Sequence, residues 1–229
     1  MTTLDILCAG ATKAAMMDFS TWLAQRSDIG LNFTFGPVGQ LKERILSGAG
    51  GQLYVLSRPA LQNLSEVGRV QPETIADVGT VGVGVAVRKG AAVPDVSSVD
   101  ALRRALLDAQ SICYGDPARG DSSGIHFASV IDRLGIREAV EPKLVLAPMG
   151  LEVVRMVAGG EVQLGATQSA VILANPGVAL AGLLPEPLQH LTTYAAGLAV
   201  AASDAAHQVL KSLMSDEARP LFERAGLHV

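Results

Sequence analysis

Short apolar runs alternate along the chain with stretches in which apolar residues recur every three or four positions. The first run, LDILCA at 4–9, predicts a buried strand, and the apolar positions of 15–23 then repeat at helical spacing. Further strands are expected at 31–35, 53–56, 78–87, 111–114, 143–146 and 162–167. Helices are expected at 39–47, 59–67, 97–108, 123–134 and 151–157. This order predicts an α/β fold in which helices cover both faces of a mostly parallel sheet.

The composition fits one large folded domain or two small lobes. The chain has 229 residues, of which 49% are hydrophobic, and its formal net charge is −4. Such a chain can bury a substantial core, which excludes disorder. It also lacks the basic patch that binds phosphate backbones, so a nucleic-acid partner is not expected. Cys8 and Cys113 each lie inside an apolar run, as small buried thiols do, and their spacing indicates neither a metal site nor a redox motif.

One stretch without charges, 162–185, is long enough to cross a bilayer but is interrupted by Asn175-Pro176-Gly177. We therefore expect two short buried elements around a turn and no membrane insertion. The N-terminus has no positively charged region before its first apolar run, which gives no sign of a secretory signal. The expected location is the cytoplasm if Met1 is native, and the periplasm if Met1 replaces a removed leader.

Small and hydroxylated residues fill three expected strand-to-helix junctions. They are AGATK at 9–13, FGPVGQ at 35–40 and DPARGDSSG at 116–124. Open α/β sheets bind ligands beyond the carboxyl ends of their strands, and a helix N-terminus there offers free N–H groups to an anion. These residue types are also the ordinary choice for turns and helix caps. Three such junctions together favour a small bound anion.

The third junction also contains a pattern typical of a different class. GDSSG at 120–124 matches the G-x-S-x-G elbow of serine hydrolases, which would make Ser122 a nucleophile. Asp116-Pro117-Ala118-Arg119 intervenes between the preceding strand and this pattern, so an N-cap that aims backbone donors at a ligand is the preferred interpretation. No nucleotide-binding or metal-binding motif occurs, and His190, His207 and His228 are scattered singly. No cofactor and no metal are expected.

At several of these positions the chain resembles a known family. The residues that carry the likeness are AGATKAA at 9–15, FGPVGQL at 35–41, VLSRP at 55–59, GVGVAVR at 82–88, YGDP at 114–117, YAAG at 194–197 and FERAG at 222–226. Together they resemble the extracellular solute-binding proteins related to the molybdate-binding component of ABC transporters. The resemblance implies a type 2 periplasmic-binding-protein fold with a ligand cleft between two lobes. It places the discontinuous first lobe at 1–82 plus 195–229, and the second lobe at 83–194.

The resemblance also implies where a ligand would be held. The hydroxyl donors of the molybdate binders correspond to Ala11, to Val38 and to Gln168. Thr12, Gly39 and Ser169 lie next to these three positions, and Ser122 lies beside the first of the backbone-amide positions, which correspond to Ser123 and to Met149 or Gly150. Because the three hydroxyl positions carry no hydroxyl here, molybdate is not the expected ligand.

Cationic and titratable side chains take the place of those hydroxyls. Lys13, Arg119, Tyr114 and His126 correspond to the ligand-facing junctions or to the helical turn beyond them. Each also has an ordinary interpretation, as a solvated cation or a packing residue. Cations beside helix N-termini suit a carboxylate, so the expected partner is a di- or tricarboxylate, with an ABC permease as a further partner only if the protein is exported.

An enzyme remains the alternative. Relatives of the molybdate binders include isomerases of small unsaturated tricarboxylates such as aconitate. That reaction needs a group that removes a proton next to a carboxylate and a cation that stabilises the resulting dienolate. The candidate catalytic residues are His126, Tyr114 and Lys13, and Arg119 would supply the cationic frame.

Overall fold

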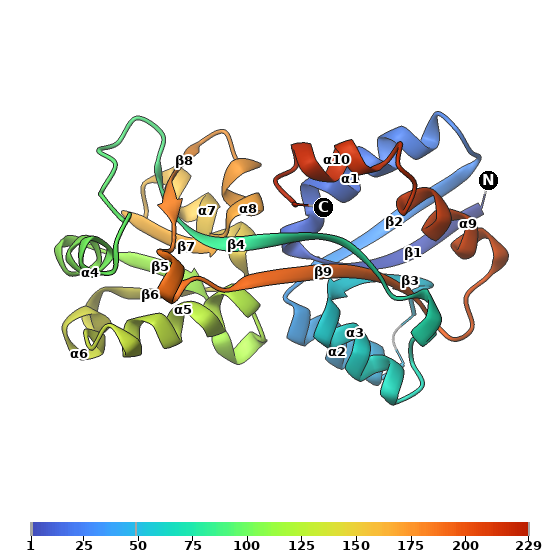
Figure 1. Cartoon of the computed structure of the whole chain (residues 1–229), viewed down its shortest axis with the longest axis horizontal. Coiled ribbons are helices and arrows are strands. Elements are labelled where there is room, and N and C mark those ends of the chain that lie inside the picture. The colour runs from blue at the N-terminus through green and yellow to red at the C-terminus, as the bar shows by residue number, and fades with distance from the viewer. Residues whose placement is uncertain (1, 49, 229) are drawn as a thin grey trace. The chain divides into compact units, whose positions relative to one another are not determined.

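The computed structural model describes residues 2–48 and 50–228, and its chain divides into two compact units. Unit 1 runs to Thr80 and resumes at Thr192, and unit 2 spans Val81–Leu191. Strands β4 (Ala76–Arg88) and β9 (Leu191–Leu198) carry the chain from one unit into the other (Figure 1). The predicted lobe boundaries, 82/83 and 194/195, lie two to three residues from these divisions. Met1 and Val229, the predicted outer limits of the first lobe, lie outside the described residues.

The strands of unit 1 follow the order β2-β1-β3-β9 in the sheet. β1 (Thr2–Ala9) pairs in parallel with β2 (Ile29–Gly36) and β3 (Leu53–Ser57), and β3 pairs antiparallel with β9. Its helices are α1 (Lys13–Ala24), α2 (Val38–Leu46), α3 (Arg58–Glu66), α9 (Asp204–Leu213) and α10 (Arg219–Arg224), with the 3-10 turns η1 (Gly10–Thr12) and η2 (Pro72–Thr74).

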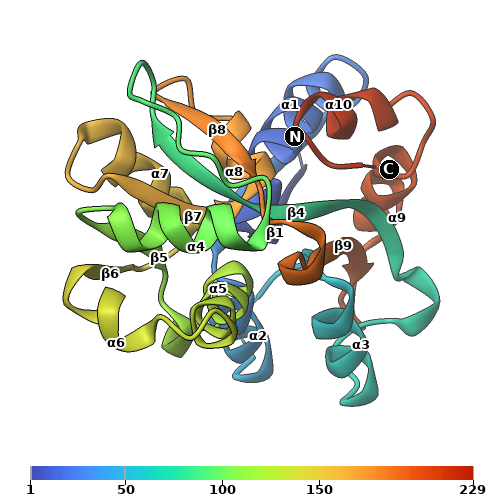
Figure 2. The ribbon, with the colours of Figure 1, turned by 60° about the vertical axis from the view of Figure 1, so that its left-hand side comes forward.

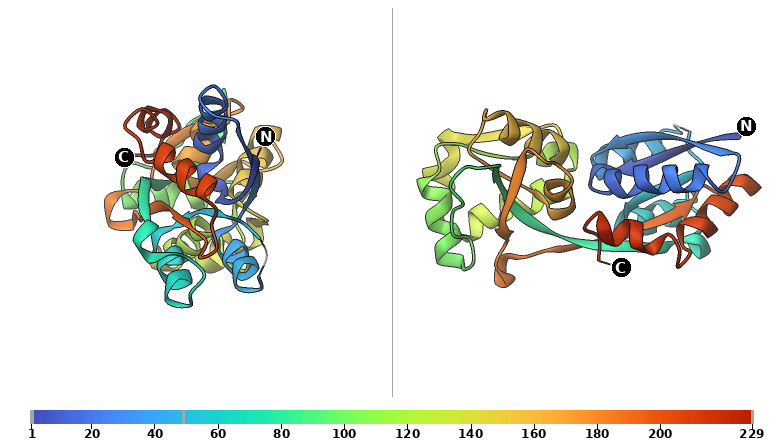
Figure 3. Two further views of the ribbon diagram at one scale, coloured as in Figure 1. Left: turned by 90° about the vertical axis from the view of Figure 1, so that its right-hand side faces the viewer. Right: turned by 90° about the horizontal axis from the view of Figure 1, so that it is seen from above.

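Helices cover both faces of this sheet. Within unit 1, α1 and α10 pack on one side, and α2 and α3 lie on the other (Figures 1 and 3). The central strand β1 is buried along Ile6, Leu7, Cys8 and Ala9, so it presents apolar side chains to both layers. A run without polar alternation is what a parallel strand covered on both faces requires.

Unit 2 has the strand order β4-β7-β5-β6, with β8 also paired to β4. β5 (Ile112–Gly115) is parallel to β6 (Leu144–Ala147) and to β7 (Leu164–Gln168), whereas β7 and β8 (Val178–Leu183) run antiparallel to β4. Its helices are α4 (Val99–Asp108), α5 (Ser122–Arg133), α6 (Arg137–Val140), α7 (Gly150–Gly159) and α8 (Ser169–Leu173), with the 3-10 turns η3 (Pro117–Arg119), η4 (Glu141–Lys143) and η5 (Glu186–Leu188).

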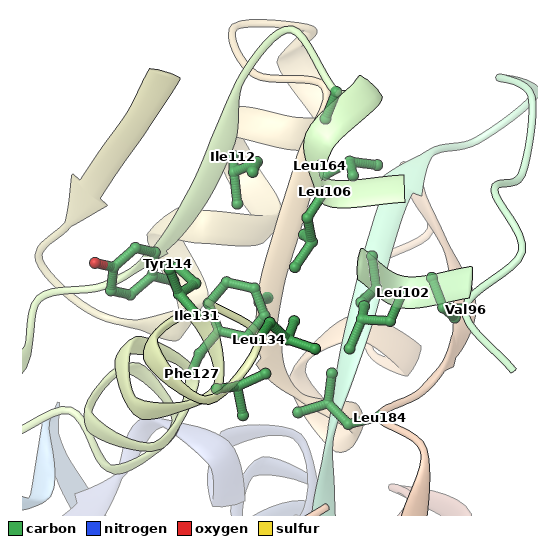
Figure 4. Close-up of a cluster of buried hydrophobic side chains, with 14 of the residues drawn as sticks. Val96, Leu102, Leu106, Ile112, Tyr114, Phe127, Ile131, Leu134, Leu164 and Leu184 are labelled. Atoms are coloured by element: carbon green, nitrogen blue, oxygen red, sulfur yellow. The ribbon is translucent and has the colours of Figure 1, made fainter. Parts of the chain in front are cut away.

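The alternation of side chains along β5 and β7 divides unit 2 into layers. Ile112 and Tyr114 of β5 join a buried cluster with Phe127 of α5 and Leu102 of α4 (Figure 4). On the opposite face of β7, a side chain at Gly165 would run into residues of α7. Accordingly, α5 and α6 lie on one side of these strands, and α7 and α8 on the other (Figures 1 and 2).

The predicted α/β fold class is confirmed. In addition to the parallel strands, β9 pairs antiparallel with β3, and β4 pairs antiparallel with β7 and β8. Every expected strand and helix overlaps an observed one, and the 162–185 stretch forms β7 and α8 before its turn and β8 after it. No strand was predicted at β8 or β9, and no helix at α6, α9 or α10. Cys8 and Cys113 are buried free thiols, and burial raises the pKa of Cys113 to about 12. Among the described helices, none combines the length and apolar character of a membrane span.

Candidate functional site

The parallel strands of unit 2 end at one edge, where two helices begin. β5 ends at Gly115 and leads through η3 into α5, and β6 ends at Ala147, two residues before the N-cap of α7. Both helices pack against β5 and β7. Their N-termini, which carry the partial positive charge of the helix dipole, therefore meet at the carboxyl edge of the sheet.

Asp121 joins these two helix starts. As the N-cap of α5, it accepts hydrogen bonds through Oδ1 from the Gly124 N–H at 2.8 Å and from the Ser123 hydroxyl at 2.7 Å. Its other oxygen, Oδ2, accepts from the Gly150 N–H at 3.1 Å, on the first residue of α7. The Ser123 hydroxyl also lies 3.4 Å from Thr167 Oγ1 of β7. One buried carboxylate thus satisfies donors on both helices.

Three glycines make room for this carboxylate. A Cβ at Gly115 would overlap the Asp121 carboxyl group, and one at Gly124 would overlap the carbonyl of Gly115. A Cβ at Gly150 would overlap the hydroxyl of Thr167. The backbone of α5 and α7 can approach the strand ends this closely only because these positions lack side chains.

Donors remain beside the Asp121 network. Within the described residues, the N–H groups of Ser122 and Ser123 have no hydrogen-bond partner, as expected for the first turn of a helix. Arg119 ends η3 two residues before Asp121, with its side chain 48% exposed and its Nε 3.8 Å from Asp116 Oδ2. This long, exposed ion pair leaves the guanidinium available to a ligand. Arg119, Ser122 and Ser123 therefore all lie on the segment that leads from β5 into the first turn of α5.

The other predicted positions of unit 2 supply fewer donors. Met149 is the extended N-cap of α7 and makes no side-chain cap hydrogen bond, and the N–H of Gly150 is taken by Asp121. Gln168 and Ser169 are buried at the end of β7 and the start of α8. α8 has only five residues. The strongest donor set of the unit is the one beside Arg119.

Unit 1 has a carboxyl edge of its own. Ala11 and Thr12 follow β1, and Val38 and Gly39 begin α2 after β2. The hydroxyl of Thr12 is buried and donates to the Ala9 carbonyl at 2.9 Å, so it does not replace the serine of the molybdate binders.

Lys13 is the exposed first residue of α1 at this edge. Its Nζ lies 5.7 Å from the centre of the Phe35 ring, at the end of β2. A cation over an aromatic face is weakly attracted but keeps its hydrogen-bond donors free. Lys13 is therefore the exposed cation of the predicted set in unit 1.

Tyr114 lies away from the carboxyl edge. Its ring packs in the core of unit 2 (Figure 4), with its centre 5.5 Å from that of the Phe127 ring. Its hydroxyl contacts the Arg137 guanidinium. Asp132 and Tyr114 both raise the pKa of Arg137. The tyrosine thus links the core to α6, and its catalytic role stays a prediction.

His126 lies on α5, one turn beyond the donors. Its Nε2 is 2.7 Å from the Leu188 carbonyl, a separation at which Nε2 carries the proton and donates. Its ring is 5.1 Å from that of His190. Burial lowers the pKa of His126, the Leu188 hydrogen bond raises it, and His190 and Arg133 lower it. The neutral ring is favoured, with Nδ1 left to accept a proton.

Two residues of this site were not predicted in their roles. Asp121 entered only as a member of the G-x-S-x-G pattern, although an Asp directly before an amphipathic helix is an N-cap signal. Its bond to Gly150 crosses 29 residues of sequence and has no local signal. Thr167 carries no signal either. No base is hydrogen bonded to Ser122, and no cluster of metal-ligating side chains occurs, among the described residues.

Comparison with known proteins defines the class first. The periplasmic molybdate-binding protein of Azotobacter vinelandii superposes with a TM-score of 0.83 at 16% identity, covering 99% of both chains. L-phospholactate-bound PEB3 of Campylobacter jejuni gives 0.75 at 15% identity, again over 99% of both chains. The fold is therefore that of the type 2 periplasmic-binding proteins, as the sequence resemblance predicted.

The family follows from the sequence. A model described as bacterial extracellular solute-binding protein matches residues 4–228. This protein belongs to that family. It is also 28% identical to an aconitate isomerase of a Pseudomonas species, over 99% of this chain and 88% of the relative.

Proposed function

We propose that this solute-binding protein binds a small organic anion with separated carboxylates, a di- or tricarboxylate. The observation that carries the proposal is the unpartnered N–H pair of Ser122 and Ser123 beside the exposed Arg119. Two N–H groups in a first helical turn match one carboxylate, and a guanidinium matches a second. Lys13 adds an exposed cation at the carboxyl edge of unit 1. In an exported form, the loaded protein would deliver this ligand to an ABC permease.

A compact inorganic oxyanion fits the side chains less well. Ala11 and Val38 have no hydroxyl group, and the hydroxyl of Thr12 already donates to the Ala9 carbonyl. An oxyanion that leaves water for a site without these donors loses hydrogen bonds that the site does not replace. We expect molybdate, tungstate and sulfate to bind weakly or not at all.

The test is titration calorimetry with the purified protein. The panel contains molybdate, sulfate, succinate, citrate and cis- and trans-aconitate. We expect at least one carboxylate to bind and the inorganic ions to give no saturable heat. Sub-micromolar molybdate affinity, or no carboxylate binding at all, would contradict the proposal.

Charge-removing variants test the residues. Lys13→Ala and Arg119→Ala should each weaken the best carboxylate by about 1–3 kcal/mol, the range for charge-assisted hydrogen bonds. Melting of the empty protein should stay nearly unchanged, because both side chains are exposed. Lys89→Ala and Arg104→Ala are matched controls on exposed residues elsewhere in unit 2. Equal losses in the controls would show a general charge effect and no site.

A second candidate, isomerisation of an aconitate-like tricarboxylate, is favoured by the 28% identical relative that spans this chain. Such a reaction moves a proton from a methylene carbon and shifts the double bond. His126 is the candidate base, since Nδ1 of its neutral ring can accept a proton. Lys13 is a further candidate for the proton transfer, and Arg119 is the candidate cation for the dienolate.

Proton exchange separates the two candidates. An isomerase incubated with cis- or trans-aconitate in heavy water should form the other isomer and place deuterium in the methylene group. His126→Gln should abolish this exchange while retaining much of the binding, and Tyr114→Phe tests whether the core hydroxyl takes part. Tight binding with neither isomer formation nor deuterium uptake would exclude the isomerase function and leave ligand binding as the proposed function.

A further inference from the structure

The Asp121 carboxylate lies at the carboxyl edge of the unit 2 sheet, where α5 and α7 begin. Backbone N–H groups at the start of a helix can bind an anion, and those of Gly124 on α5 and Gly150 on α7 lie at this edge. Here the Gly150 N–H donates to Asp121 Oδ2, and the N–H of Gly124 and the hydroxyl of Ser123 donate to Oδ1. N–H groups that could bind the oxygen atoms of a ligand therefore already donate to the Asp121 carboxylate.

This carboxylate is built into the fold. Asp121 is only 7% exposed, and a buried carboxylate is costly unless several donors surround it. Three hydrogen bonds and the positive ends of two helices provide that environment. The glycines at 115, 124 and 150 let the backbone close around it. Each of these features would be needed to hold a fixed negative charge at this edge.

A fixed charge here acts differently on different ligands. The remaining donors, the N–H groups of Ser122 and Ser123, belong to the residues that directly follow Asp121. A compact dianion bound there brings two like charges close to the carboxylate, whereas one carboxylate of a longer ligand brings a single charge. The other carboxylates of the longer ligand can lie farther from Asp121, and the exposed Arg119 is a cation that could pair with one of them.

We infer that Asp121 is a specificity-determining residue of the proposed anion site, which excludes compact dianions by taking their donors and repelling their charge. This inference rests on the proposed function for the identity of the ligand, but its effect on inorganic oxyanions stands by itself. Repulsive elements of this kind set specificity by weakening the wrong ligand.

Two variants test the inference by different routes. Asp121→Asn removes the charge at nearly constant volume, and with its Oδ1 kept on Ser123 and Gly124, its Nδ2 faces the Gly150 N–H and cannot accept a hydrogen bond from it. Asp121→Ser keeps a favoured N-cap side chain, which is too short to reach Gly150. We expect the affinity for sulfate and molybdate, measured by calorimetry, to rise at least tenfold in both variants. Asp100→Asn, which removes one charge from the first turn of α4, is the matched control and should change affinity less than twofold.

A measurement on the unaltered protein needs no variant to fold. In an amide NMR titration with sulfate at high concentration, the resonances of Gly124 and Gly150 should stay unshifted, because Asp121 already holds both N–H groups. Titration with the best carboxylate should shift Ser122 and Ser123 most.

The outcomes are distinguishable. A gain of oxyanion binding in the variants supports the inference even if no carboxylate binds the wild type, a result that would remove only the proposed function. Unchanged oxyanion affinity in folded variants would show that Asp121 acts only as the N-cap of α5, which would overturn the inference. Tight molybdate binding by the wild type, or sulfate-induced shifts centred on Gly150, would overturn it as well.

Discussion

Gly124 sets how closely α5 approaches the end of β5. The Cβ of any other residue would overlap the Gly115 carbonyl, which is backbone and cannot rotate away. We expect Gly124→Ala to destabilise the protein by about 1–3 kcal/mol or more, the range for overpacking. Chemical denaturation followed by circular dichroism measures this difference.

Gly50→Ala is the control for this residue. Among the described residues, its chain neighbours aside, no atom lies within 4 Å of a Cβ built at Gly50. A methyl group there should leave the free energy of unfolding within about 0.5 kcal/mol of the wild type, as for other exposed positions. Equal stability of the two variants would show that α5 can move off β5 without cost.

Residue-scale signals explain why part of the site was accessible from sequence. Arg119, Ser122 and Ser123 were found because glycine, proline and serine mark a strand-to-helix junction locally. The hydrogen bond from Gly150 to Asp121 was not predicted, because it depends on two helices that start at the same edge of the sheet. Tyr114 was proposed for the site because it ends a strand, yet side chains alternate between faces, and its own points into the core.

At the scale of elements, two side chains of α5 donate hydrogen bonds to carbonyl groups of η5. His126 Nε2 donates to the Leu188 carbonyl, and Arg133 on the same helix donates to the Pro187 carbonyl at 2.5 Å. Because burial lowers the pKa of His126 below its usual 6.5, the folded state binds fewer protons than the unfolded state just below that pH. Its contribution to stability is complete above about pH 6.5 and is lost as the pH falls toward the folded pKa.

His126→Gln should remove the contribution of this side chain to the pH dependence of stability. We expect the melting temperature of the wild type to fall more steeply than that of the variant between about pH 7 and pH 5. Above pH 8 the two slopes should agree, which serves as the internal control. Parallel curves over the whole range would show that His126 is not linked to unfolding.

Elements were predictable where their own residues carried the pattern. β1 and β7 were found because apolar runs mark buried strands. β8 reads VALAGL, and its alanine and glycine have low strand propensity, so its pairing with β4 decides its structure. The helices α9 and α10 follow the last strand, in a segment whose fold depends on β1 and α1 far earlier in the chain.

The whole molecule consists of one continuous unit and one interrupted unit. Unit 2, Val81–Leu191, contains a closed hydrophobic cluster of its own. Unit 1 needs its C-terminal segment, because β9 pairs with β3 and α10 packs on α1. We expect a fragment of residues 81–191 to melt cooperatively by circular dichroism, and a fragment of residues 1–80 to show no cooperative transition.

Reciprocal outcomes would contradict that expectation. Cooperative melting of 1–80 would show that β1, β2 and β3 form a stable sheet without β9. A featureless 81–191 would show that its cluster needs the rest of the chain. Mixing 1–80 with a peptide of residues 192–229 is the complementary control, since together they supply every strand of the unit 1 sheet.

The interruption of unit 1 also fixes an order of events on the ribosome. Synthesis delivers β1, β2 and β3 first, yet the strand that covers the free edge of β3 arrives about 140 residues later. During that interval unit 2 is completed and can fold, while β3 presents unpaired backbone groups to neighbouring chains. The nascent protein is therefore most exposed to aggregation in its earliest-made part, and the last segment to emerge removes that exposure.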